Sequence, residues 1–337
     1  MKVFWRPLPV LLLVIAAGPA GAAPLAYISN ERARTVTVID TATDRVTATI
    51  RVGGRPRGVE VSADGRRVYV ALSGEVRNQR SDDDGITVID ARTAKVIRRY
   101  DAGTDPERFA ISRDGRKLYA SNEDAGTATI TELRTGRVIA TAVVGIEPEG
   151  VAISPDGRWV YVTAETSNTV SVISTRTNRV AASFMVDPRP RAAAFSPDGT
   201  RAYVTAEIGG TVSVVDTRKH QVIDTIALPG GAKAVGIAVA PDGKHAYVTT
   251  SHWNSVAVID TAMNKVVTTV PVGKRPWGIG ITPDGRKVYT ANGVSNDVSV
   301  IDTASHRVVA TIKAGDGAWG VAIGPAVSMN LDRAHRR

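Results

Sequence analysis

The residues best suited to chemistry in this sequence lie in Gly/Pro loops that recur between its repeats. One loop position changes from copy to copy, reading Arg57, Glu107, Glu149, Arg191, Val235, Trp277 and Trp319. Arginine binds a carboxylate or phosphate through two parallel hydrogen bonds, and an indole offers a flat stacking surface. Except for the valine, these residues predict a site for a small anionic or planar aromatic ligand. The alternative is that the arginines and glutamates pair with each other, each exposed pair contributing about 0–1 kcal/mol.

A second group of polar residues is predicted on the same face of the molecule. Its members are Glu31, Glu123, Glu165, Glu207, His252 and Asn292. Hard cations such as Ca²⁺ take oxygen ligands, which carboxylates from successive repeats could supply. Their spacing does not match a dedicated calcium loop. We therefore expect no metal site and no bound cofactor, with a Ca²⁺-like cation as the alternative.

Catalysis would need an acid–base pair, and the sequence offers one candidate. His252 could work with Glu165 or Glu207 in an enzyme of lactonase or lyase type. The chain has no G-x-S-x-G nucleophile motif, and its Gly-Gly pairs lack the strand–GxGxxG–helix context of a dinucleotide site. We therefore expect a binding protein without catalytic residues, and the hydrolase or lyase is the alternative.

These candidates are carried by a repeat that the sequence contains seven times. Tyrosines open the copies at Tyr27, Tyr69, Tyr119, Tyr161, Tyr203, Tyr247 and Tyr289, with spacings of 42 to 50 residues. In the fourth copy, short apolar runs predict strands at 150–154, 159–164, 169–174 and 179–184. A period of about 40–45 residues with four strands is typical of a β-propeller blade. The sequence predicts an all-β, seven-bladed propeller over residues 23–325.

Turn residues sort the polar side chains onto two faces. Pro155-Asp156-Gly157 predicts a tight turn between the first and second strands of a blade, and Asp-Gly pairs recur there. Because strands alternate in direction, these turns lie on one face and the Gly/Pro loops on the other. The first repeat begins at its second strand, 25–30, and the last apolar run, 319–324, reads as a first strand. We expect this C-terminal strand to complete the N-terminal blade and close the ring.

The N-terminal segment predicts export. Residues 1–22 hold basic Lys2 and Arg6, a short apolar run and a cleavage motif that ends at Ala22. This arrangement is typical of a signal peptide, so we expect a periplasmic protein. The sequence has no cysteine, which excludes disulfides and a c-type haem attachment.

Two further segments depart from the repeat. Residues 72–85 replace a short loop in blade two with polar sequence, which we expect to be an exposed loop. Residues 326–337 are basic and lack a strand pattern, which predicts a disordered tail.

No apolar run after residue 22 exceeds strand length, so we expect no transmembrane segment in the mature chain, and we expect a monomer.

The net charge is +9, from 42 Lys and Arg against 33 Asp and Glu. Many of the basic residues follow the Asp-Gly turns, as Arg66, Arg116 and Arg158 do. Such a basic face is either a solvated rim or a surface that attracts an anionic lipid or an acidic partner. Aromatic residues that could stack on bases do not accompany it, so we expect no binding of nucleic acid.

The repeats resemble the YVTN family of seven-bladed β-propellers over nearly all of residues 25–325. The likeness rests on Tyr161-Val162-Thr163-Ala164, on the segment 150–157 and on the segment 298–303. Segments 144–150, 206–213 and 290–298 also resemble the subfamily associated with pyrroloquinoline-quinone (PQQ)-dependent alcohol catabolism. This resemblance implies an exported protein that accompanies quinoprotein dehydrogenases, with a small molecule or a periplasmic protein as its partner. It does not imply that the chain binds the quinone, and the family has no agreed catalytic residues.

Overall fold

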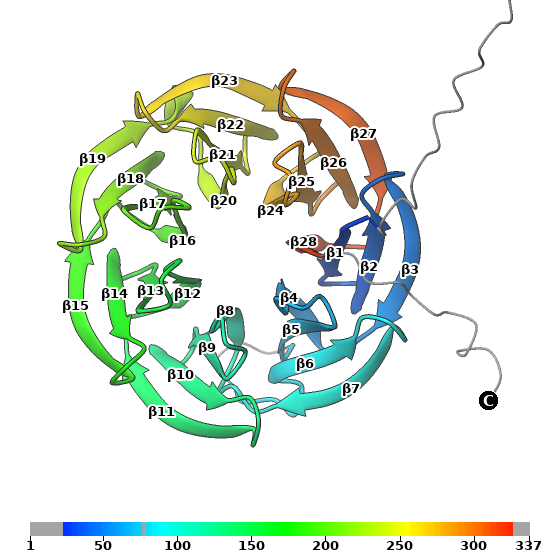
Figure 1. Cartoon of the computed structure of the whole chain (residues 1–337), viewed down its shortest axis with the longest axis vertical. Coiled ribbons are helices and arrows are strands. Elements are labelled where there is room, and N and C mark those ends of the chain that lie inside the picture. Colours follow the sequence, from blue (N-terminus) through cyan, green and yellow to red (C-terminus); the bar gives the residue numbers. More distant parts are fainter. Residues whose placement is uncertain (1–22, 76–78, 326–337) are drawn as a thin grey trace, which may run out of the picture.

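The computed structural model describes residues 23–75 and 79–325. Within these ranges the chain forms twenty-eight strands and one 3-10 turn, η1 (Pro229–Gly231). The strands make seven four-stranded sheets, arranged as blades around a central axis (Figure 1). The predicted seven-bladed propeller is confirmed. The predicted signal peptide at 1–22 and basic tail at 326–337 lie outside the described residues.

Within each blade the four strands follow one another from the axis outward, and each strand pairs antiparallel with its neighbours. Blades 1 to 4 contain, in that order, β28 (Ala318–Gly324), β1 (Leu25–Asn30), β2 (Thr35–Asp40) and β3 (Arg45–Arg51); β4 (Arg55–Val61), β5 (Arg67–Ser73), β6 (Gly85–Asp90) and β7 (Lys95–Tyr100); β8 (Pro106–Ile111), β9 (Lys117–Asn122), β10 (Thr127–Glu132) and β11 (Arg137–Val143); and β12 (Pro148–Ile153), β13 (Trp159–Ala164), β14 (Thr169–Ser174) and β15 (Arg179–Met185). Blades 5 to 7 contain β16 (Pro190–Phe195), β17 (Arg201–Ala206), β18 (Thr211–Asp216) and β19 (Gln221–Ala227); β20 (Ala234–Val239), β21 (His245–Thr250), β22 (Ser255–Asp260) and β23 (Lys265–Pro271); and β24 (Pro276–Ile281), β25 (Lys287–Asn292), β26 (Asp297–Asp302) and β27 (Arg307–Lys313).

Local sequence explains the tight turns at one face. In blade 4, the Ser154 hydroxyl donates to the Asp156 carboxylate at 2.6 Å, and the Arg158 amide donates to the same oxygen at 3.0 Å. Gly157 follows with φ +70°, a conformation that L side chains rarely adopt. Blades 2, 3, 5 and 7 repeat this bonding with their own Ser or Thr and Asp residues. The turns therefore hold the first two strands of these five blades in a common register.

The core lies between neighbouring blades. The repeat tyrosines sit in the second strand of each blade and are at most 3% exposed. Valine, isoleucine and alanine from two adjacent blades surround them, as Val212 and Val214 of blade 5 pack with Val248 and Ile259 of blade 6. Burial of apolar area, at about 25 cal/mol per Å², drives this packing. The outermost strands are mostly exposed, as in β7.

Glycines in the inner strands let the blades approach closely at the axis. A Cβ on Gly150 would lie 2.6 Å from the Arg191 carbonyl oxygen of the next blade, and one on Gly278 would lie 2.4 Å from that of Trp319. Both distances are shorter than any ordinary contact. The same inner-strand position is glycine or alanine in six blades and Arg108 in blade 3.

The two ends of the described chain meet in one blade. β28 pairs with β1, with Leu25 opposite Gly324 and Ile28 opposite Val321. The predicted closure of the ring by the C-terminal strand is therefore confirmed (Figure 1). Closure leaves β1 paired on both sides, which removes edges that would otherwise pair with other chains.

Some boundaries differ from those the sequence predicts. The inner strand of blade 4 begins at Pro148 rather than at residue 150, because Pro148 already faces Ala164 ahead of a register shift. In the insertion of blade 2, Leu72 and Ser73 extend β5 and are buried, so the exposed loop is shorter than residues 72–85. No helix within residues 23–75 and 79–325 has the length and apolar character needed to cross a membrane.

Candidate functional site

A β-bulge positions one side chain from each blade at one end of the central channel. The register of every inner strand shifts there, for example between Pro56 and Val59 and between Pro106 and Phe109. Bulges bend a strand and redirect the side chain of the extra residue. The variable residues of the sequence sit within these bulges: Arg57, Glu107, Glu149, Arg191, Val235, Trp277 and Trp319. We call this end of the channel the mouth.

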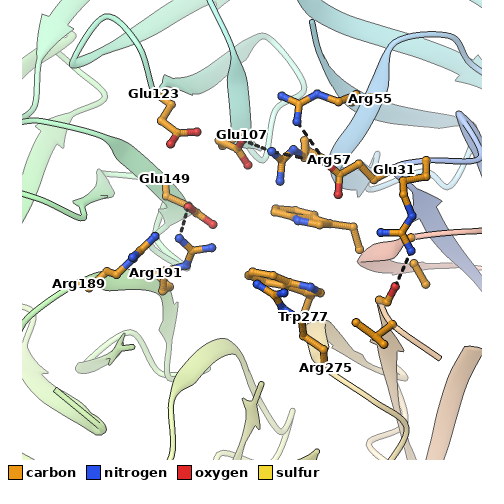
Figure 2. Close-up of a pocket in the computed structure, with 16 residues that line it drawn as sticks. Glu31, Arg55, Arg57, Glu107, Glu123, Glu149, Arg189, Arg191, Arg275 and Trp277 are labelled. Atoms are coloured by element: carbon orange, nitrogen blue, oxygen red, sulfur yellow. Dashed lines mark hydrogen bonds and ion pairs between the residues drawn. The ribbon is translucent and has the colours of Figure 1, made fainter. Parts of the chain in front are cut away.

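The mouth encloses a cavity of about 280 Å³. All six residues predicted to bind a ligand line it: Arg57, Glu107, Glu149, Arg191, Trp277 and Trp319. Arg55, Arg189 and Arg275 lie around the same space, so arginines surround it from several blades (Figure 2). The structure therefore gathers the predicted set into one site.

One cluster of ion pairs joins blades 1, 2 and 3. Arg57 lies 3.1 Å from Glu107 and 3.7 Å from Glu31, and Arg55 lies 3.3 Å from Glu31. Arg55 also lies 3.5 Å from Asp105. The Arg57 and Glu107 side chains are 10% and 2% exposed. The Arg57–Glu107 pair is thus buried and the Arg55–Glu31 pair is partly exposed, whereas the sequence predicts exposed pairs.

A second cluster joins blades 4 and 5. Arg191 contacts Glu149 at 3.0 Å and Glu207 at 3.6 Å, and it also bonds to Glu165. Arg189 reaches Glu165 at 2.8 Å and Glu207 at 3.2 Å, but its side chain is 45% exposed. The pairing of arginines with glutamates, which the sequence offers as the alternative, is therefore present, and Arg189 and Arg191 also line the cavity.

The two tryptophans lie between arginines. Their rings stack at 6.4 Å with an interplanar angle of 20°. The guanidinium carbon of Arg57 lies 5.5 Å from the Trp319 ring, while those of Arg191 and Arg275 lie 5.3 and 5.0 Å from the Trp277 ring. Cations over an aromatic face are attracted to its quadrupole. The indoles therefore contact an arginine from each of the two ion-pair clusters.

Burial changes the protonation chemistry of the mouth. Burial raises the pKa of Glu107 well above its usual range, with Arg57 opposing the shift and Glu149 adding to it. Burial alone would lower the pKa of Arg57, but Glu107 and the other nearby carboxylates raise it overall. Arg57 therefore stays cationic, and burial favours the protonated form of Glu107.

The carboxylates form one cluster that could hold a cation. Ligand atoms of Asp105, Glu107 and Glu123 lie within 4.8 Å of one another. Oxygen-only ligands suit a hard cation such as Ca²⁺. Arg55 and Arg57 already pair with Asp105 and Glu107, so a cation would compete with two guanidinium groups. Of the carboxylates that the sequence offers as ligands for a cation, Glu123 belongs to this cluster. Glu31, Glu165 and Glu207 lie outside it and pair with arginines.

Of the six secondary candidates, Glu31 and Glu123 line the cavity, whereas Glu165, Glu207, His252 and Asn292 are not among its lining residues. His252 is exposed on its loop, and its ring nitrogen lies 3.2 Å from the Ser251 hydroxyl. Asn292 is buried and donates to Asp297 at 2.6 Å and to Ser299 at 3.0 Å. Neither is among the residues that line the mouth cavity. Asn292 supports the turn between β25 and β26, a role that its sequence position alone does not reveal.

Two charged residues deeper in the channel are not among the site residues that the sequence predicts. Arg108 and Glu60 line a second cavity below the mouth. Aligned by repeat, the other six blades carry glycine or alanine at each of these positions. Arg108 and Glu60 therefore stand out when the inner strands of the seven repeats are aligned, because the other blades have only glycine or alanine there.

The fold and the site together define a seven-bladed β-propeller with a charged, tryptophan-lined channel mouth. The family model described as "Lactonase, 7-bladed beta-propeller" matches residues 182–311, and that of a choice-of-anchor I domain matches residues 22–186. Each match covers less than half of the chain. The search of curated proteins found no match.

Several solved structures share this fold. A chain of Kuenenia stuttgartiensis hydrazine synthase matches with a TM-score of 0.74 and 22% identity, covering 87% of this chain and 99% of that one. A proposed 6-phosphogluconolactonase from Bacteroides uniformis matches with a TM-score of 0.73 and 19% identity, covering 89% and 99%. The dihydro-heme d1 dehydrogenase NirN, solved in complex with DHE, matches with a TM-score of 0.67 and 17% identity, covering 90% and 76%. At these identities the likeness shows the fold alone.

Proposed function

We propose that the channel mouth binds a small, planar, anionic ligand such as an aromatic carboxylate. The observation that carries this proposal is the stacked pair Trp277 and Trp319 with guanidinium groups over both rings. A flat aromatic body would lie against the indole surface, and its anionic group would be met by arginine. The roughly 280 Å³ of the cavity suits a ligand at the small end of the range found in proteins.

In this proposal the protein is an exported, non-catalytic partner of PQQ-dependent alcohol oxidation. The resemblance of its repeats to the PQQ-associated propellers supports that role, and the signal-peptide pattern at residues 1–22 supports a periplasmic location. The ligand of the mouth would then be a small molecule or a periplasmic protein side chain of the same anionic, planar chemistry.

A lactonase is the second candidate function. It is favoured by the match of residues 182–311 to the lactonase propeller model and by the fold shared with a proposed 6-phosphogluconolactonase. The arginines could bind a sugar phosphate, and Glu107, whose pKa burial raises, could exchange a proton with the substrate. The acid–base pair suggested by the sequence gains no support, because His252 is not part of the cavity lining and Glu165 is held by Arg189 and Arg191.

Fluorescence titration with 2-naphthoate tests the binding proposal. The naphthoate should quench the tryptophan emission of the purified protein, and the neutral analogue 2-naphthol should bind at least tenfold more weakly. Trp277→Ala should weaken naphthoate binding at least tenfold. Trp253→Ala is the matched control, because Trp253 is 57% exposed and lies outside the mouth cavity. Equal binding by both variants would contradict the proposal.

An assay of 6-phosphogluconolactone hydrolysis separates the two functions. The binding proposal expects the rate with protein to equal the spontaneous rate. Hydrolysis that is accelerated by the protein and lost in Glu107→Gln would favour the lactonase instead.

A further inference from the structure

The channel below the mouth contains a second cavity of about 300 Å³. Trp319 is a lining residue of both cavities. Aliphatic side chains and polar groups of the inner strands line this second cavity together. Its aliphatic lining includes Val59, Val61, Val151, Ile279, Val321 and Ile323.

One of the residues that line this cavity is a cation, Arg108. Among the described residues, no carboxylate oxygen lies within ion-pair distance of Arg108, and its Nε and Nη2 are buried without a hydrogen-bond partner. A buried donor without a partner carries a free-energy cost of about 1–3 kcal/mol, and more when the group is charged. The Arg108 guanidinium carbon lies 4.8 Å from the Trp319 ring, whose own N–H is also buried without an acceptor.

The fold itself does not require an arginine at this position. The matching residue is Gly58 in blade 2, Gly150 in blade 4 and Ala192 in blade 5. In those blades the inner strand keeps the same bulge without a long side chain. Arg108 is therefore an addition to the repeat, and it lines a space large enough for a small molecule.

We propose that the inner cavity binds a short aliphatic carboxylate, with Arg108 holding the carboxylate and the valine and isoleucine walls holding the hydrocarbon chain. A guanidinium group matches a carboxylate with two parallel, charge-assisted hydrogen bonds, and burial of the chain adds about 0.8 kcal/mol per CH₂. This site is separate from the mouth and does not rest on the function proposed for it.

The other ionisable group of the cavity fits an anionic ligand at neutral pH. Glu60 accepts a hydrogen bond from the Ile111 amide at 3.1 Å. Burial raises the pKa of Glu60 to about 8, with that hydrogen bond opposing the shift. Glu60 is thus largely protonated at pH 7 and does not repel a carboxylate there.

The alternative is that Arg108 only balances the charge of the mouth. Glu149 and Glu107 both raise the pKa of Arg108, although burial lowers it overall, and Arg191 and Arg57 act in the same direction as burial. A side chain with this role alone would bind no anion, and its removal would alter the stability of the protein without creating or removing a ligand site.

Isothermal titration calorimetry with hexanoate at pH 7 distinguishes the two roles in the full-length protein. We expect hexanoate to bind, 1-hexanol to bind at least tenfold more weakly, and Arg108→Gly to lose at least tenfold in affinity for hexanoate. The glycine is the residue that blades 2, 4, 6 and 7 carry at this position, and the circular dichroism of the variant shows whether it folds.

Two further variants complete the experiment. Arg108→Lys keeps the charge but loses the two-pronged geometry, so it should bind hexanoate more weakly than the wild type and more tightly than Arg108→Gly. Arg275→Ala, which removes a mouth arginine over Trp277, should bind hexanoate as the wild type does. The proposal is overturned if hexanoate does not bind the wild type, if Arg108→Gly binds it equally well, or if Arg275→Ala loses as much affinity as Arg108→Gly. None of these results bears on naphthoate binding at the mouth.

Discussion

Replacing Arg191 with methionine should destabilise the propeller more than any change at an exposed arginine of the mouth. The Arg191 side chain is 8% exposed and contacts Glu149, Glu165 and Glu207. Methionine has a similar length but no charge, so it would leave three carboxylates at the mouth without their main cation. Removing one partner from a buried ion pair typically costs about 3–5 kcal/mol, because the remaining charge is buried and uncompensated.

The expected change in melting temperature follows from the size of the domain. Unfolding entropy is about 2.1 cal/mol/K per residue near 60 °C, which gives about 0.6 kcal/mol/K for the roughly 300 described residues. A loss of about 3–5 kcal/mol therefore lowers the melting temperature by roughly 5–8 °C. Differential scanning calorimetry at pH 7 would measure this shift directly. At acidic pH the carboxylates are protonated, so the difference between the variant and the wild type should shrink.

Arg189→Met provides the matched control. Arg189 contacts two of the same carboxylates, Glu165 and Glu207, but its side chain is 45% exposed. Pairs that remain in contact with water contribute about 0–1 kcal/mol, so this variant should melt within about 2 °C of the wild type. Adding Glu165→Gln to Arg191→Met should recover part of the lost stability, since it removes one uncompensated charge. If Arg191→Met melted no lower than Arg189→Met, the argument that burial makes these pairs costly to break would be refuted.

Two further predictions concern ring closure and the inner channel. Deleting residues 317–324 removes β28 and leaves β1 unpaired on one side, so the variant should aggregate or lose its cooperative transition; a monomeric variant with an unchanged melting temperature would contradict closure. Because burial raises the pKa of Glu60 from 4.5 to about 8, the native state keeps a proton that the unfolded chain loses between these values. Stability should therefore fall as pH rises through this window, by at most about 1.4 kcal/mol per unit of pKa difference. Urea unfolding of Glu60→Gln at pH 5 and pH 8 should show a weaker pH dependence, and an identical dependence would argue against the shift.

The architecture was predictable because it depends on local and repeated chemistry. The tyrosine spacing, the Asp-Gly turns and the alternation of valine with threonine each act over a few residues, and each recurs along the chain. The pairing of β28 with β1 also followed from the sequence, since a chain that begins at a second strand needs a first strand from elsewhere.

The site was only partly predictable because it depends on which blades lie opposite each other across the channel. Position in the repeat identified Arg57, Arg191, Trp277 and Trp319 as mouth residues. It did not show that the indoles stack on each other between arginines, since that contact joins side chains from different blades at close range. Arg108 was not predicted because it occupies the inner-strand position after the variable loop position, where the other repeats carry only glycine or alanine.

Because Leu25 pairs with Gly324, an attachment at either residue would orient the propeller in the same way. β28 runs from the mouth toward the opposite face, and β1 starts there and runs back toward the mouth. A tether joined at either of these residues would therefore leave from one point, on the face away from the arginines and tryptophans. A propeller anchored through either residue would present the face that carries the arginines and tryptophans away from the anchor.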